Sequence, residues 1–374
     1  MPPVVIDIRS AEDSRDVVHR AVQALVEGKL VAFPTETVYV LAASALCEPA
    51  VERLAAVHRC TPEHPLTLAV KSAAEAQDYV PEMSPLGMRL ARRCWPGPVT
   101  LVVADDHPES VVRQLPTAVR EAVTGDGMIG LRVPAHAAIH DVLRMIAGPI
   151  VLSTAQRDGT EAVTAQQVVE QAGDDVQLVL DDGRSRFGQP ASVVRVRDKQ
   201  LDVLRAGVVS EQNLRRLSSL MILFVCTGNT CRSPMAERIC RHLLAERLRC
   251  KVEELPDRGV MVVSAGTSGM MGGRAAREAV QVLSMSGIDL ADHETRPLTA
   301  QLVRHADFLL VMTRAHRQAI LTEWPEAAER TRLVCHSGQD VADPIGGPAE
   351  EYQRCAAQIR AELEAWVDEF QKFV

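Results

Sequence analysis

The sequence predicts an α/β protein with two domains. Its 374 residues exceed the length of one typical domain, and 47% of them are hydrophobic, which is enough for two cores. Strand-like apolar runs alternate with helix-like periodic segments through residues 1–210. A new apolar strand then begins at Met221, after a polar stretch with a helical pattern at 208–219. We therefore expect one domain at 1–215 and a second at 221–374, joined by a short linker.

The first domain alternates helices and strands in chain order. Amphipathic patterns predict helices at 17–26 and 51–57. Short aliphatic runs predict buried strands at 30–33, 66–70, 99–103, 129–133 and 150–153. This order indicates a twisted mixed sheet with helices packed against it.

One glycine-rich segment imitates a dinucleotide-binding loop. Residues 125–130 read Gly-Asp-Gly-Met-Ile-Gly, which matches the spacing of that fingerprint. The segment precedes a predicted strand instead of following one, and no helix pattern begins after it. We therefore expect a glycine turn there.

The second domain opens with the most informative segment of the chain. Residues 221–225 are apolar and predict a buried strand, and apolar residues recur with helical period from Met235 onwards. Ser233 and Pro234 are the residue types expected at the N-cap and in the first turn of that helix. The pattern is strand, short loop, helix.

Two side chains in this loop carry chemistry. Cys226 and Arg232 lie six positions apart across a segment that contains Gly228. Backbone N–H groups at the start of a helix bind a phosphate dianion, and the same positive surroundings favour a thiolate. The alternative is a buried structural thiol. The same spacing recurs at Cys47 and Arg53, but the residues between them include no glycine, so an ordinary helix is expected there.

Composition excludes several classes of protein. No run of eighteen apolar residues is present, and the N-terminus lacks the basic and apolar regions of a signal peptide, so no membrane contact is expected. Nine scattered cysteines indicate a reducing compartment and a cytoplasmic protein. A net charge of -8 argues against a dedicated nucleic-acid binder. No His/Cys cluster has zinc-site spacing, so we expect no metal.

Residues 221–374 resemble the low-molecular-weight protein-tyrosine-phosphatase family. The resemblance covers the loop at 226–234, Ser-Ala-Gly-Thr at 264–267, Met-Thr at 312–313 and Asp-Pro at 343–344. It implies that Cys226 is the nucleophile, that Arg232 grips the phosphoryl oxygens, and that Asp343 is first general acid and then general base. The implied phosphate-binding loop consists of Thr227, Gly228, Asn229, Thr230, Cys231 and Ser233. The implied fold is a Rossmann-like α/β domain with a parallel sheet. No cofactor is implied, and the implied substrates are phosphorylated proteins.

The leaving group distinguishes two kinds of phosphatase. Members that act on phosphotyrosine carry a bulky aliphatic residue where this loop has Thr230, and aromatic residues after the Asp-Pro pair, where this chain has Ile345. The loop is similar to that of bacterial protein-arginine phosphatases, which favours phosphoarginine over the alternative, phosphotyrosine. An arsenate reductase would need a cysteine pair that is missing midway through the domain. We expect His293 and His316 to be surface groups.

Residues 4–210 resemble the YrdC-like family of threonylcarbamoyl-AMP synthases. The similar segments are 33–39, 64–66, 95–101 and 130–134. That family makes an adenylate from ATP, bicarbonate and threonine for a modified adenosine of tRNA. The resemblance implies a threonine and nucleotide site made by Thr35, His64, Arg132, Thr154, Ser192 and Arg205.

This first domain also departs from the family pattern. His58 and Cys60 stand where a Lys-x-Arg pair is expected, and Val40 replaces a glycine. Losing two cations next to phosphate and carbonate oxygens weakens binding, so we expect a slow or inactive synthase. The alternatives are an active synthase in tRNA modification, or a module that senses nucleotide or RNA and regulates the phosphatase.

Overall fold

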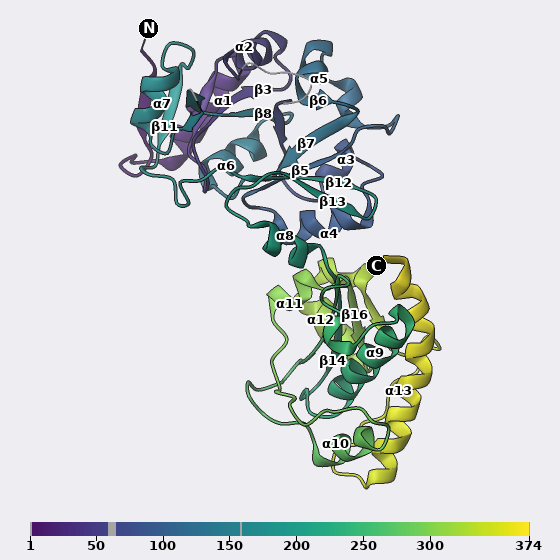
Figure 1. The fold of residues 1–374 in the computed structure, drawn as a ribbon. Helices are drawn as coiled ribbons and strands as arrows, with labels where there is room; N and C mark the ends of the chain where they lie inside the picture. The colour runs from purple at the N-terminus through teal and green to yellow at the C-terminus, as the bar shows by residue number, and fades with distance from the viewer. Residues whose placement is uncertain (1, 59–64, 158, 374) are drawn as a thin grey trace. The chain divides into compact units, whose positions relative to one another are not determined.

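The contacts of the chain divide it into two units, Met1–Leu217 and Ser218–Val374. The structure is a computed structural model that describes residues 2–58, 65–157 and 159–373 (Figure 1). None of the described helices is both long and apolar enough to span a lipid bilayer. Each unit is described on its own below.

The first unit is built on one mixed sheet. Its strand order is β1-β11-β2-β3-β8-β4-β7-β5-β12-β13, with β6 paired to β7. Parallel and antiparallel neighbours are both present, as in the β1–β11 and β2–β3 pairs. The strands are β1 (Val4–Asp7), β2 (Val31–Phe33), β3 (Val40–Ser44), β4 (Thr67–Ala69), β5 (Val99–Ala104), β6 (Thr124–Gly125), β7 (Met128–Arg132), β8 (Ile150–Thr154), β11 (Leu178–Asp181), β12 (Ser192–Arg197) and β13 (Gln200–Arg205), and a separate hairpin joins β9 (Gln156–Arg157) to β10 (Thr160–Glu161). The predicted mixed α/β fold is confirmed.

Helices cover both faces of this sheet. They are α1 (Ser14–Val26), α2 (Glu48–His58), α3 (Ala76–Tyr79), α4 (Pro85–Cys94), α5 (Thr117–Val123), α6 (Ala137–Met145), α7 (Ala165–Ala172) and α8 (Glu211–Ser218), with a 3-10 turn η1 at Val111–Gln114. Val31 and Phe33 of β2 join the core formed with α1 and α6, whereas Ala32 joins the core formed with α2, α4, α5 and α7. Side chains alternate between the faces of a strand, so the short aliphatic runs seen in the sequence serve two cores at once.

Two segments that match a ligand-binding motif only in spacing, residues 125–130 and 47–53, adopt the expected structures. Asp126 and Gly127 have φ of 52° and 69° and form the turn between β6 and β7, which is the backbone of a tight hairpin. Cys47 lies directly before α2, and Arg53 of that helix donates to the Gly28 carbonyl. Neither segment forms a phosphate loop.

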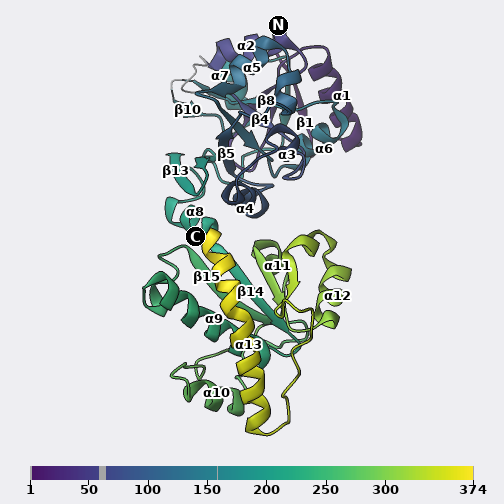
Figure 2. The ribbon, with the colours of Figure 1, turned by 90° about the vertical axis from the view of Figure 1, so that its right-hand side faces the viewer.

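The second unit has a parallel sheet of order β15-β14-β16-β17. The strands are β14 (Leu220–Cys226), β15 (Val260–Gly266), β16 (Phe308–Val311) and β17 (Thr331–Leu333), and the helices are α9 (Arg232–Leu248), α10 (Arg277–Ser284), α11 (Ala300–His305), α12 (Arg314–Glu323) and α13 (Ala349–Phe370), with 3-10 turns η2 (Val252–Glu254), η3 (Pro325–Arg330) and η4 (Gln371–Phe373). The long helix α13 lies beside α9 (Figure 2). Helices α9, α10 and α13 share one core, and α11 and α12 share the other. The central strand β14 is buried on both faces, which explains its continuous apolar run.

The start of α9 differs from the prediction. The helix begins at Arg232 with Cys231 at the N-cap, and no side chain caps its first turn. The prediction that Ser233 is the N-cap is therefore wrong. The Ser233 hydroxyl bonds to the loop that precedes the helix, so it is not available to cap a helix N–H group.

The end of β15 approaches the loop after β14 too closely for a side chain. A Cβ on Gly266 would lie 2.5 Å from the Thr227 carbonyl oxygen and 2.9 Å from the Asn229 nitrogen. Both of these atoms belong to the backbone, so neither can move away without moving the loop. Glycine at this position is therefore a requirement of the loop's shape.

We predict that Gly266→Ala lowers the free energy of unfolding by about 1–3 kcal/mol, the usual cost of overpacking, and weakens phosphate binding. Urea unfolding and calorimetric titration with inorganic phosphate measure the two effects. Gly148→Ala is the matched control, because its Cβ would meet only the side chain of Leu46, which is 54% exposed and free to move. Unchanged stability and unchanged phosphate affinity in Gly266→Ala would contradict the prediction.

Candidate active site

The loop between β14 and α9 lies at the carboxyl end of the central parallel strand. Cys226 ends β14, and Arg232 begins α9. The neighbouring strands β15 and β16 are parallel to β14, so their carboxyl ends reach the same edge of the sheet. In an open parallel sheet this edge is where ligands bind.

A buried amide fixes the shape of the loop. Asn229 has φ of 57°, the left-handed region that few non-glycine residues adopt. Its Nδ2 donates to Ser233 Oγ (3.0 Å) and to Ser264 Oγ (2.9 Å), and its Oδ1 accepts from the Arg296 backbone N–H (2.9 Å). Ser264 in turn donates to the buried Glu237 carboxylate (2.6 Å). Every polar atom of the amide has a partner, so the unusual backbone conformation is held from three directions.

The thiol of Cys226 is buried next to a hydroxyl. Its Sγ lies 3.0 Å from Ser233 Oγ. Asn229 donates to Ser233 Oγ, so the single hydroxyl proton of Ser233 is shared between the sulfur and the Ala265 carbonyl (3.3 Å). A hydroxyl donor and a helix N-terminus both stabilise a thiolate over a thiol.

Arg232 is buried beside the thiol and carries an unused donor. One terminal nitrogen donates to the Val341 carbonyl (3.3 Å), and the other pairs with the Asp343 carboxylate. Within the described residues its Nε has no hydrogen-bond partner, although it is shielded from solvent. Buried donors rarely stay unpaired, so an oxyanion ligand in the loop would complete this guanidinium.

Asp343 lies in a loop after β17 and is half exposed. Its second oxygen accepts from the backbone N–H of Ile345 (3.3 Å), which orients the carboxylate. The side chain of Ile345 is 66% exposed, so it does not form an apolar wall of the site. The structure therefore brings the three implied catalytic side chains, Cys226, Arg232 and Asp343, to one place.

The loop residues Thr230 and Cys231 face a different neighbour. Cys231 Sγ lies 3.5 Å from Thr230 Oγ1 and 3.6 Å from the Tyr352 hydroxyl of α13. Burial raises the pKa of the Cys231 thiol. The Thr230 carbonyl accepts from the Ala276 N–H (2.9 Å), which ties the loop to the segment before α10.

Two histidines that we expected on the surface are buried against the loop. His293 is 3% exposed and its Nε2 donates to the Asn229 carbonyl (2.9 Å); His316 is 7% exposed and its Nε2 lies 2.9 Å from Thr227 Oγ1. Burial lowers the pKa of both imidazoles. The surface prediction is wrong because His316 follows strand β16, and because the segment after His293 is hydrogen-bonded to Gly266 at the end of β15. For His316 there was a signal in the sequence, since it follows the expected end of the strand at 308–311 by a few residues.

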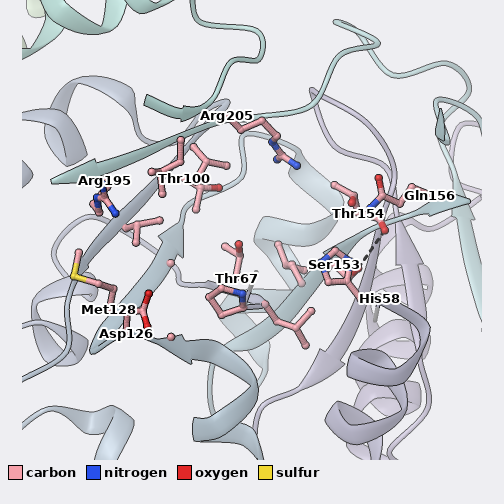
Figure 3. A pocket seen from close by; sticks show the side chains of 18 of the residues that line it. His58, Thr67, Thr100, Asp126, Met128, Ser153, Thr154, Gln156, Arg195 and Arg205 are labelled. Carbon is pink, nitrogen blue, oxygen red and sulfur yellow. Dashed lines mark hydrogen bonds between the residues drawn. The ribbon is translucent and has the colours of Figure 1, made fainter. Parts of the chain in front are cut away.

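The first unit has a cavity of about 680 Å³ lined by residues of β4, β5, β7, β8, β12 and β13. Of the six residues implied by resemblance, Thr154 and Arg205 line it (Figure 3). His58 lies across from Arg205, and its Nδ1 is 2.8 Å from Ser153 Oγ. The other polar lining residues, which sequence reasoning missed, are Thr67, Thr100, Asp126, Gln156, Arg195 and Arg197.

The remaining implied residues of this unit lie elsewhere. Thr35 lines a second cavity of about 410 Å³, with its hydroxyl donated to the Val38 carbonyl (2.6 Å). Arg132 is buried in an ion pair with Glu36 (2.7 Å). The Ser192 hydroxyl bonds to both backbone groups of Val209. His64, like Cys60, lies outside the described residues.

Comparison with known families matches each unit separately. The family model described as low molecular weight phosphotyrosine protein phosphatase matches residues 221–374. A protein-arginine-phosphatase from Geobacillus stearothermophilus is 38% identical over 151 residues, which cover 39% of this chain and 90% of that protein. A probable low molecular weight protein-tyrosine-phosphatase from Ralstonia nicotianae is 36% identical over 150 residues, 39% of this chain and 92% of that protein.

The first unit matches a second family. The Sua5/YciO/YrdC family model, described as telomere recombination, matches residues 23–207. The threonylcarbamoyl-AMP synthase of Pyrococcus abyssi is 32% identical over 193 residues, 51% of this chain. The chain spans only about half of that synthase (54%). A solved structure of P. abyssi Sua5 has a TM-score of 0.51 at 22% identity, covers 70% of this chain and 91% of its own, and shows the shared fold.

These matches agree with the two units and with the loop geometry of the second. The chain is a protein phosphatase that belongs to the low-molecular-weight phosphatase family through residues 221–374 and carries a Sua5/YrdC-family domain at 23–207.

Proposed function

We propose that residues 221–374 hydrolyse phosphoarginine in proteins through a phosphocysteine intermediate. The observation that carries this proposal is the buried Arg232 at the N-terminus of α9, in the loop segment that begins with Cys226. Its Nε donor has no partner within the described residues. A bound phosphoryl group would accept from that guanidinium and from the loop N–H groups. Such a group would place its phosphorus against the Cys226 sulfur.

The proposed reaction has two steps. Cys226 attacks phosphorus, the S–P bond forms, and the P–N bond to the arginine side chain breaks while Asp343 donates a proton to the leaving nitrogen. Asp343 then takes a proton from water, the water oxygen attacks phosphorus, and the S–P bond breaks to release phosphate and the thiolate. The Ser233 hydroxyl, 3.0 Å from the sulfur, supports the thiolate as both attacking and leaving group.

The polarity of the loop mouth supports arginine as the leaving group. Thr230 offers a hydroxyl that can accept from a guanidinium N–H, and an apolar phenol ring would leave this hydroxyl unpaired. Ile345 points to solvent and gives a flat ring no wall to pack on. Relatives of both substrate classes are similar to this domain, so the proposal depends on these side chains. Phosphotyrosine is the alternative substrate.

For the first domain we propose binding of ATP and threonine, with bicarbonate, but slow or absent synthesis of threonylcarbamoyl-AMP. Thr154 and Arg205 line the same cavity, which supports ligand binding. His58 stands where the resemblance expects a lysine, and a histidine is mostly neutral at the pH at which a lysine is charged. The alternatives remain an active synthase in tRNA modification and a nucleotide- or RNA-sensing module. We place the protein in the cytoplasm.

We predict that Cys226→Ala abolishes turnover of p-nitrophenyl phosphate and phosphoarginine, because the nucleophile is gone. Asp343→Ala should reduce phosphoarginine turnover about 10²–10⁴-fold, the usual contribution of a general acid, with phosphate affinity nearly intact. Steady-state kinetics and calorimetric titration measure these effects. Asp292→Asn is the control, because that exposed carboxylate pairs only with Arg238. Full activity in Cys226→Ala would refute the mechanism.

We predict that the wild-type protein prefers phosphoarginine to phosphotyrosine in peptides of one sequence, and that Thr230→Ile shifts the preference towards phosphotyrosine. An aliphatic side chain removes the acceptor and adds a surface for the ring. The measurement is kcat/KM for both peptides in both proteins. A wild type that favours phosphotyrosine by tenfold or more, about 1.4 kcal/mol in transition-state binding, contradicts the arginine assignment.

We predict that the full chain with Cys226→Ala binds ATP but releases pyrophosphate from ATP, bicarbonate and threonine only at background rates. The physical reason is the missing positive charge at His58. His58→Lys restores one cation and should tighten ATP binding in calorimetric titration. Pyrophosphate release at rates typical of enzymes, dependent on both threonine and bicarbonate, would show instead that the synthase is active.

A further inference from the structure

A second hydroxyl lies at the mouth of the phosphate loop. Thr227 follows Cys226 directly and is exposed, and its Oγ1 lies 2.9 Å from Nε2 of the buried His316. The reaction proposed above gives this threonine no role. Its hydroxyl is nevertheless held in one place by His316, which lies in the first turn of helix α12.

His316 is held as firmly as the hydroxyl it contacts. Its Nδ1 lies 2.8 Å from Oγ1 of Thr313, the N-cap of α12, and that oxygen also accepts the backbone N–H of His316 (3.2 Å). The charged groups that act on the ring are Arg232, Asp343 and Asp340. Burial, together with Arg232, lowers the pKa of the imidazole, so the neutral ring is favoured.

A neutral imidazole has one N–H donor and one acceptor nitrogen. When Nδ1 carries the proton, it donates to Thr313 Oγ1, and Nε2 accepts the hydroxyl proton of Thr227. The proton of Thr227 then points at His316, and both lone pairs of its oxygen face the loop mouth. In this arrangement Thr227 is a pure acceptor towards any group that enters the site.

The leaving group must lie at the mouth of the loop, which His316 borders through Thr227. It has to lie between Cys226, which attacks the phosphorus, and Asp343, which protonates the leaving atom. His316 contacts the hydroxyl of Thr227, which follows Cys226 directly, so the ring lies close to the nucleophile's end of the loop. Thr230 lies on the other side, where its neighbours are Cys231 and the segment before α10.

We propose that Thr227, oriented by His316, is a second specificity-determining residue that accepts an N–H of the leaving guanidino group. The proposal rests on the phosphoarginine function argued above and extends it. With Thr227 and Thr230 on either side, the loop offers two hydroxyl acceptors to a forked group that carries several N–H donors. A phenol leaving group has no N–H to offer, so Thr227 contributes nothing to phosphotyrosine. His316 is a positioning residue and does not contact the substrate.

The test compares leaving groups in the full chain. Thr227→Val keeps the shape of the side chain and removes the acceptor, so kcat/KM for a phosphoarginine peptide should fall at least about tenfold, as for a lost hydrogen bond to a charged group. The value for the matched phosphotyrosine peptide and for p-nitrophenyl phosphate should fall by a much smaller factor, because neither leaving group has an N–H to donate to Thr227. Thr267→Val, a threonine in the neighbouring loop with an exposed side chain, is the control and should change neither value.

The role of His316 is tested through Thr227. His316→Ala should cause the same selective loss as Thr227→Val, and the double variant should be no worse than either single one, because both remove one interaction. His316→Gln keeps a side-chain acceptor and should recover part of the phosphoarginine activity. A structural role would instead lower activity on all substrates together.

The outcomes separate the two hypotheses. If wild type hydrolyses phosphoarginine but Thr227→Val lowers all substrates equally, or none, this inference is wrong and the proposed function stands. If wild type hydrolyses p-nitrophenyl phosphate and phosphotyrosine but not phosphoarginine, the proposed substrate is wrong, and the inference is wrong with it. Selective loss in Thr227→Val and His316→Ala supports both.

Discussion

The conformation of Asn229 is the constraint on which the phosphatase site depends. A left-handed residue in the middle of the loop turns the chain between Cys226 and Arg232, and it persists because its amide is fully hydrogen-bonded in the interior. Leaving one buried polar group unpaired costs about 1–3 kcal/mol, so each partner contributes to keeping this turn. The same amide reaches Ser233, and so the group that fixes the backbone also positions the hydroxyl next to the thiol.

Much of this site could be predicted because its parts are adjacent in sequence. A buried strand, a loop with Cys226 and Arg232, and a following helix are local features with known periodicities. The buried role of His293 could not be predicted, since it lies in the loop between α10 and α11, far in sequence from the residues it contacts, whereas for His316 the position after the strand at 308–311 was a signal. The prediction that Ser233 is the N-cap of α9 is wrong for a related reason. Ser233 has the composition of a cap, but it is recruited by Asn229 and Cys226, a contact that propensity does not include.

The first domain shows the limit of transferring sites by resemblance. Its strands and helices follow the hydrophobic pattern, so the mixed sheet could be read from the sequence. The site could be read only in part: Thr154 and Arg205 share a cavity, whereas Arg132 is paired with Glu36 and Ser192 is bonded to Val209. Buried polar residues in a segment that resembles a family motif can hold the fold together, and sequence alone does not separate that role from ligand binding.

The pairing of Arg232 with Asp343 means that the phosphatase site contains its own counter-ion. An incoming anion has to displace this carboxylate before it can use the guanidinium fully. A chloride ion carries one charge and offers no bidentate geometry, so it gains little from the exchange, whereas a phosphoryl dianion gains two parallel hydrogen bonds. When inorganic phosphate departs, the carboxylate can return to the guanidinium. The internal ion pair therefore favours selection against the abundant monovalent anions of the cell.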